Sequence, residues 1–195
     1  MSMIRKSVTI PEMINQSIEV VTSPSVPTFE KYEKNGTLAN AAIYVAIGAV
    51  ISGLLGIFSG GLGGAIAGLL GALVQFFVFT GLVYYIGQQQ GGSGTWDEVA
   101  YTFSLFSVPL TVIGAVVTLV LGLLLFIPII NIIAGFALLI VGLLLLIAQI
   151  YFGYLAVQSS MNLREQNKAV ITLVLAAVGT FLALIVVTGI GSIFT

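Results

Sequence analysis

The charged residues of this 195-residue chain are few and are confined to three short stretches. Six are Lys or Arg and seven are Asp or Glu, and they lie within residues 5–34, at 97–98 and at 164–168. Only apolar, glycine and neutral polar residues occupy the long segments between them. A charge at the centre of a bilayer costs about 2.5–3.5 kcal/mol on insertion scales, so such segments are typical of membrane-spanning helices. The sequence therefore predicts a polytopic membrane protein.

The composition excludes a soluble domain and several kinds of chemistry. Apolar residues make up 58% and charged residues 7% of the chain, whereas about 25% are charged in soluble domains. The absence of Cys and His excludes disulfides, thiolate nucleophiles, imidazole bases and the common zinc sites. The net charge of −1 gives no bulk attraction to nucleic acid. We expect no cofactor, no metal and no nucleic-acid partner.

Five segments are apolar and long enough to cross the hydrocarbon, which takes about 20 residues. They cover about residues 38–58, 63–86, 97–126, 131–158 and 169–193. A sixth span would require a polar break in the third or fourth segment, and neither contains one. A β-barrel would show alternating rather than continuous apolar residues. We expect an all-α membrane protein, in which residues 38–195 form a five-helix transmembrane bundle.

Basic residues predict how this bundle is oriented, since they are concentrated in cytoplasmic loops. An odd number of spans puts two basic groups on one side: Arg5, Lys6, Lys31 and Lys34 before the first span, and Arg164 and Lys168 before the fifth. The loops near Gly60 and Pro128 carry no charge. We therefore expect a cytoplasmic N-terminus and an extracytoplasmic C-terminus.

Residues 1–37 form a predicted cytoplasmic segment with a short amphipathic helix over about 9–22. Thr9 can cap this helix and Pro11 suits its first turn. Its apolar face comprises Met13, Ile14, Ile18 and Val21. Such a face either binds a partner protein or lies in the membrane interface or on the ends of the bundle, which is the more common arrangement.

Small residues recur every four positions in the first two spans. One row is Gly48, Ser52 and Gly56, and the other is Gly60, Gly64 and Gly68. This spacing lets helix backbones approach closely in a membrane. It predicts packing of the first two spans against each other or a homo-oligomer interface, with a glycine-lined pore as a lesser alternative.

Three further residues inside the spans are candidates for special roles. Pro109 removes a helical hydrogen bond and predicts a kink, either static or a hinge for gating. Gln75 and Gln149 are candidate intramembrane polar contacts, since such amides commonly hydrogen-bond across helices. They could also line a polar path.

The entry to the third span and the nearby tyrosines indicate the membrane boundary. Thr95 and Glu98 have the spacing of a capping box, and Trp96 is placed at headgroup depth. An interfacial aromatic belt is predicted for Tyr84, Tyr85, Tyr101, Tyr151 and Tyr154. A cytoplasm-facing site at which their hydroxyls converge is the alternative.

No ionisable residue lies deep in a predicted span. Ion-coupled carriers, pumps and voltage sensors normally have one there, and the usual catalytic groups are also missing. We therefore expect a protein that is not an enzyme and has no catalytic residue.

Several local patterns combine into a family resemblance. They are residues 23–29 (SPSVPTF), 92–99 (GSGTWDEV), Pro109, residues 127–130 (IPII), residues 153–158 (GYLAVQ), and Lys168-Ala169 at the start of the last span. Over about residues 20–190 the chain resembles the Yip1 family of five-span membrane proteins, in particular its short prokaryotic branch. Eukaryotic members of that family are trafficking adaptors that bind Rab GTPases and each other.

The resemblance implies a multi-pass protein of a prokaryotic cytoplasmic membrane, in contact with lipids. We expect a non-enzymatic protein that organises membrane or binds partner membrane proteins or itself, as an adaptor or small subunit. The alternative is a passive channel, a small-solute facilitator or a lipid-handling protein. Its motivation is the glycine-rich second span, Gln75, Gln149 and Pro109.

Overall fold

A computed structural model describes residues 8–191 of the chain, except for the side chains of residues 58–60 and 187–191. The described residues form helices joined by short connections and contain no strand. The helices are α1 (Ile10–Thr22), α2 (Val26–Glu30), α3 (Leu38–Gln89), α4 (Trp96–Leu124), α5 (Ile130–Ser160) and α6 (Gln166–Gly191).

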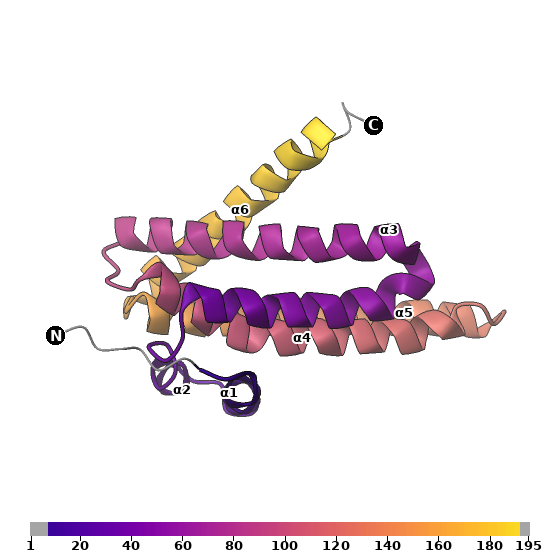
Figure 1. Cartoon of the computed structure of the whole chain (residues 1–195), viewed down its shortest axis with the longest axis horizontal. Coiled ribbons are helices and arrows are strands. Elements are labelled where there is room, and N and C mark those ends of the chain that lie inside the picture. The colour runs from indigo at the N-terminus through magenta and orange to yellow at the C-terminus, as the bar shows by residue number, and fades with distance from the viewer. Residues whose placement is uncertain (1–7, 192–195) are drawn as a thin grey trace.

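Five helical segments have the length and apolar composition to cross a membrane, which confirms the predicted all-α, five-span class. Their bounds are Leu38–Ile57, Gly61–Gln89, Trp96–Leu124, Ile130–Ser160 and Gln166–Val186. The first two are the arms of α3, which folds back on itself at Gly61 (Figure 1). Gly61 has φ +62° and ψ −174°, a conformation that glycine adopts at no steric cost because it has no Cβ. Residues 192 and 193, which end the predicted fifth span, lie outside the described part.

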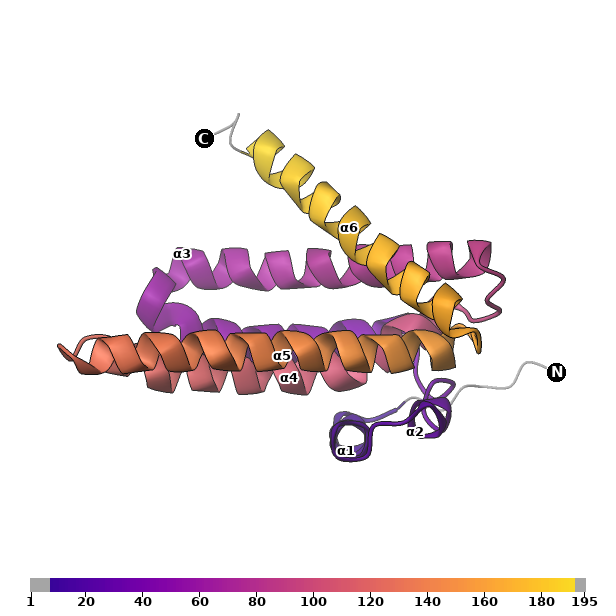
Figure 2. The ribbon, with the colours of Figure 1, turned by 180° about the vertical axis from the view of Figure 1, so that it is seen from behind.

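The two ends of the bundle differ in character (Figures 1 and 2). The connections α3–α4 and α5–α6 lie at one end together with α1 and α2, and the Gly61 turn and the α4–α5 connection lie at the other. Arg5 and Lys6 lie outside the described residues, and the remaining charged side chains belong to the first end, called here the charged end. α6 begins there and diverges from the other spans along its length.

The protein core is concentrated toward the charged end. Phe29 of α2 packs edge-on against Phe106 of α4, with ring centroids 6.1 Å apart. Phe106 in turn stacks on Phe152 of α5 at 5.6 Å. Farther along the spans most large apolar side chains are exposed, including Leu123, Ile132, Leu143 and Leu182. Such exposure is unfavourable in water and is what a hydrocarbon solvent allows.

Capping interactions explain where the helices start. At α4, Thr95 N–H donates to Glu98 Oε2 (2.8 Å) and Glu98 N–H donates to Thr95 Oγ1 (3.3 Å), which confirms the predicted capping box. The Thr9 cap of α1 is also confirmed, with Glu12 completing the box. Asp97 accepts a 2.7 Å hydrogen bond from the N–H of Leu38, so the starts of α3 and α4 are tied together.

Candidate functional site

The N-terminal helices form a layer on the charged end of the bundle. α1 is seen almost end-on in Figures 1 and 2, so it runs across the spans rather than along them. Met13 and Val20 are fully buried, whereas Ile14 and Ile18 are 45% and 56% exposed. The predicted apolar face is therefore divided between the bundle and the outside. A helix lying in a membrane interface has this pattern.

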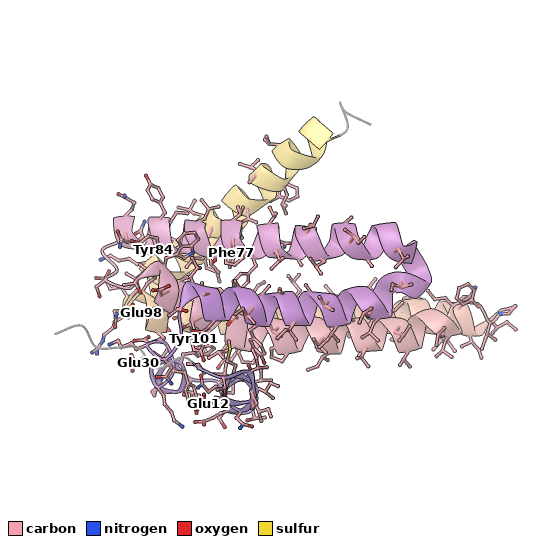
Figure 3. All side chains as sticks on the ribbon, viewed as in Figure 1. Glu12, Glu30, Phe77, Tyr84, Glu98 and Tyr101 are labelled. Carbon is pink, nitrogen blue, oxygen red and sulfur yellow. The ribbon has the colours of Figure 1, made fainter. Side chains whose placement is uncertain are left out.

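Two tyrosines of the spans hold α1 in place. Tyr44 of α3 donates a 2.9 Å hydrogen bond to Ser17, and Tyr101 of α4 donates a 2.7 Å hydrogen bond to Gln16. Tyr101 is fully buried and is labelled in Figure 3 beside the N-terminal layer. Its predicted place in an interfacial aromatic belt is wrong, because α1 covers it. Tyr85 and Tyr151 remain exposed.

An ion pair joins α1 to the turn after α2. Lys31 Nζ lies 2.7 Å and 2.9 Å from the two carboxylate oxygens of Glu19, and Tyr32 also donates a hydrogen bond to Glu19. The hydrogen bond from Lys31 is the main reason that the pKa of Glu19 is lowered, and it raises the pKa of Lys31. The pair is solvent-exposed, so it orients the segment more than it stabilises it.

A buried carboxylate connects the N-terminal segment to α5. Glu33 is only 3% exposed and accepts a 2.6 Å hydrogen bond from the hydroxyl of Ser159. Burial raises the pKa of Glu33, and the Ser159 hydrogen bond partly opposes this effect. The ammonium of Lys34 lies 3.8 Å from the carboxylate. Sequence reasoning missed Glu33, because nothing in its local pattern sets it apart from the exposed Glu30.

At the charged end, two glycines allow neighbouring segments to pack closely because they have no Cβ. A Cβ at Gly36 would collide with the ring of Tyr101, and a Cβ at Gly94 would collide with the carbonyl oxygen of Ser160. Next to Gly94, Ser93 N–H donates a 3.0 Å hydrogen bond to the carbonyl of Met161. The α3–α4 connection is thus packed tightly on the end of α5.

A cavity of about 600 Å³ lies between α3, α4, α5 and α6. Its wall is mostly apolar, with Phe76, Phe79, Phe103 and Phe106 among the lining residues. Five polar side chains also line it: Gln75, Ser107, Thr111, Gln149 and Thr180. The structure therefore brings both predicted intramembrane amides to one place.

The amides of Gln75 and Gln149 line this cavity. Neither makes a hydrogen bond to any described residue. Pro109 lies on α4 between the cavity residues Val108 and Thr111. The helix continues through it, and a hinge at this position remains a prediction.

The two predicted small-residue rows have different surroundings. A Cβ at Gly48 would lie 2.8 Å from Val108 Cγ1, so Gly48 packs against α4. The hydroxyl of Ser52 is buried and has no hydrogen-bond partner among the described residues. At Gly56, Gly64 and Gly68 a Cβ would meet no atom within 4 Å. No described atom thus packs against these three positions at Cβ distance; the side-chain surroundings of Gly60 lie outside the described part, and a helix-packing or oligomer role for the rows stays a prediction.

A comparison with family models decides the family. The model of the Yip1 domain matches residues 18–187. The chain belongs to the Yip1 domain family. No curated protein sequence and no solved structure matches it.

The Yip1 match begins within α1 and extends into α6. It therefore includes α2, the Glu33–Ser159 contact and every residue that lines the cavity. Among residues 8–191, no group of three or more Asp and Glu residues could hold a metal ion. The described part of this Yip1 domain thus contains a mostly apolar cavity lined by two amides, and an N-terminal layer joined to the spans by polar contacts.

Proposed function

We propose that this Yip1-domain protein is a non-enzymatic membrane adaptor or small subunit that binds partner membrane proteins, or itself, through the second arm of α3. The observation that carries the proposal is the open space beside Gly64 and Gly68. Leu62, Ile66 and Leu70 of the same arm are between 57% and 71% exposed. Small residues on an uncovered helix favour close packing of another transmembrane helix, because packing rather than hydrophobicity drives association in lipid.

The same proposal places the N-terminal segment, residues 1–37, on the cytoplasmic side of the transmembrane domain, residues 38–195. The basic residues Lys31, Lys34, Arg164 and Lys168 all belong to the charged end, and basic loops are retained in the cytoplasm. The C-terminus is then extracytoplasmic. The membrane would be a prokaryotic cytoplasmic membrane, and α1 and α2 would be open to cytoplasmic contacts.

The experiment is affinity recovery from the native membrane in a mild detergent. We expect a membrane protein, or a second copy of this chain, to co-purify in stoichiometric amount. Gly64→Leu should abolish this recovery and leave the chain folded. Gly142→Leu is the matched control, since Gly142 is equally open but lies on α5. Two results would contradict the proposal: recovery of the chain without a partner, or equal amounts of partner recovered with Gly64→Leu and Gly142→Leu.

A passive channel, small-solute facilitator or lipid-handling protein is the second candidate, because the structure contains a cavity at Gln75 and Gln149. This function requires solute flux or lipid movement in liposomes that contain the purified protein. Gln75→Leu should then reduce the rate by removing a polar group from the cavity. Rates equal to those of protein-free liposomes would exclude it.

A further inference from the structure

The polar side chains of the cavity lie at one depth in the bundle. Gln75 and Gln149 precede the charged ends of their helices by 14 and 11 residues, and Ser107, Thr111 and Thr180 follow theirs by 11 to 15 residues. At a rise of 1.5 Å per residue these positions are about 16–22 Å from the charged end. The hydrocarbon core is about 30 Å thick, so the polar groups surround the cavity near the middle of the bilayer.

The two amides have no hydrogen-bond partner among residues 8–191 whose side chains are described. Thr180 satisfies its hydroxyl by donating a 2.8 Å hydrogen bond to the carbonyl of Ala176, but Gln75 and Gln149 bond to no described residue. An amide that faces hydrocarbon without a hydrogen bond is strongly unfavourable. An occupant that supplies oxygen atoms near the bilayer centre would remove this penalty.

The wall of the cavity restricts the charge of that occupant. Within the described part of the chain no charged side chain lines it, and aromatic and aliphatic residues make up most of the lining. An ionised head group would therefore be left without a counter-charge in an apolar site, which is costly. The phosphate of a phospholipid belongs at the membrane surface rather than at this depth.

The cavity is also accessible from the surrounding bilayer. Leu146 and Ile150 of α5 and Phe181 of α6 line the cavity and are 53% to 64% exposed. The exposed lining residues thus place the opening between α5 and α6, two helices that diverge in Figure 2. A volume of about 600 Å³ is within the range of sites that hold small organic ligands.

We propose that the cavity binds one uncharged lipid whose carbonyl or hydroxyl groups hydrogen-bond to Gln75 and Gln149. The apolar part of the lipid contacts the phenylalanine wall and leaves the cavity between α5 and α6. This inference is independent of the adaptor proposal, which concerns the outer face of α3. It also requires no transport, since a lipid can be bound without being moved.

The test is photolabelling in phosphatidylcholine liposomes. The probe is a diacylglycerol with a diazirine in one acyl chain, and the comparison probe is a phosphatidylcholine with the same modified chain. We expect the diacylglycerol probe to label peptides of α5 and α6 that line the cavity several-fold more than the phospholipid probe does. Unlabelled diacylglycerol should compete with it.

Two kinds of variant localise the site. Ala177→Phe fills the cavity and should abolish the competed labelling, whereas the neighbouring Val178→Phe, outside the lining, should retain it. Gln75→Leu with Gln149→Leu keeps the volume but removes the hydrogen bonds, and should lower labelling about three- to ten-fold. Gel filtration shows whether Ala177→Phe folds. If it does not, the double glutamine variant is the test of the site.

Three results would overturn the inference. The first is equal labelling by both probes, and the second is labelling that Ala177→Phe and the glutamine variants leave unchanged. The third is no labelling of the lining peptides, which would leave water as the occupant of the cavity. None of them would affect partner recovery through Gly64. The adaptor proposal and this inference can therefore fail separately.

Discussion

Ser159, near the end of α5, donates a 2.6 Å hydrogen bond to the carboxylate of Glu33, which lies between α2 and α3. Both side chains are buried. The contact spans 126 positions of sequence and fixes the N-terminal segment to the charged end of the bundle. A partner that binds from the cytoplasm would contact the layer of α1 and α2, and the position of this layer depends on the Glu33–Ser159 hydrogen bond.

Removal of the Ser159 hydroxyl should destabilise the protein. Ser159→Ala leaves a buried carboxylate without its hydrogen bond, and bonds to charged groups contribute about 1.5–3 kcal/mol. We expect a loss of this size at pH 8, measured by denaturant titration in detergent micelles. A loss below about 0.5 kcal/mol would show that water replaces the hydroxyl.

Glu33 should also make stability dependent on pH. Burial raises the pKa of Glu33 above the value of 4.5 for an unperturbed carboxyl group, so the folded state holds this proton more tightly than the unfolded chain does. Its contribution is then fully present below pH 4.5 and is lost as pH rises through the raised pKa of the folded state. Glu33→Gln should abolish this loss and retain a thermal midpoint at pH 8 at least equal to that of the wild type.

The pH prediction has a direct control. Glu30→Gln removes an exposed carboxylate whose charge is the smallest of the causes that raise the pKa of Glu33, so it should change the slope of thermal midpoint against pH far less than Glu33→Gln does. If Glu33→Gln has the same slope as the wild type between pH 4 and 8, the buried carboxylate is not its cause.

Gly94→Ala should weaken the contact between the α3–α4 connection and α5. The added methyl group would collide with the carbonyl oxygen of Ser160, and crowding of this kind costs about 1–3 kcal/mol. Gly122→Ala is the matched control, because a Cβ there meets nothing within 4 Å. Equal thermal midpoints for the two variants would contradict the close approach at Gly94.

Docking of α1 should depend on Tyr44 and Tyr101. Replacing both by Phe removes the hydrogen bonds to Ser17 and Gln16, each worth about 1 kcal/mol. We expect amide hydrogen exchange in α1 to become about ten-fold faster or more, with little change in α5. Tyr85→Phe, at an exposed tyrosine, should have no effect. Unchanged exchange in the double variant would mean that Met13 and Val20 suffice to hold α1.

The helices and their starts could be predicted from the sequence because the signals are local. Continuous apolar segments without charge identify membrane spans, and the spacing of Thr95 and Glu98 identifies a capping box. Glycine at position 61 permits a tight turn, but its positive φ cannot be told from that of the other glycines around it. The sequence therefore predicted a short loop near Gly60, and the structure has a helix that folds back at one residue.

The faces of the spans could not be predicted, because protein interior and lipid are both apolar. The spacing of Gly48, Gly64 and Gly68 identifies flat helix surfaces and says nothing of what covers them. Val108 covers the first, and no described residue covers either of the others. Likewise, Gln75 and Gln149 are 74 positions apart, and only the packing of α3 on its neighbours brings them to one cavity. The sequence places Tyr101 in an interfacial aromatic belt, because it does not show that α1 packs over this side chain.

The side of the membrane on which the charged end lies tests the account most directly, because cytoplasmic contacts of the N-terminal layer depend on it. The chain has no cysteine, so single cysteines report their own accessibility to a membrane-impermeant maleimide in intact spheroplasts. We predict that Phe126→Cys, in the α4–α5 connection, is labelled from outside, and that Lys34→Cys and Arg164→Cys are labelled only after permeabilisation. Labelling of Lys34→Cys or Arg164→Cys from outside, with Phe126→Cys protected, would contradict the proposed orientation.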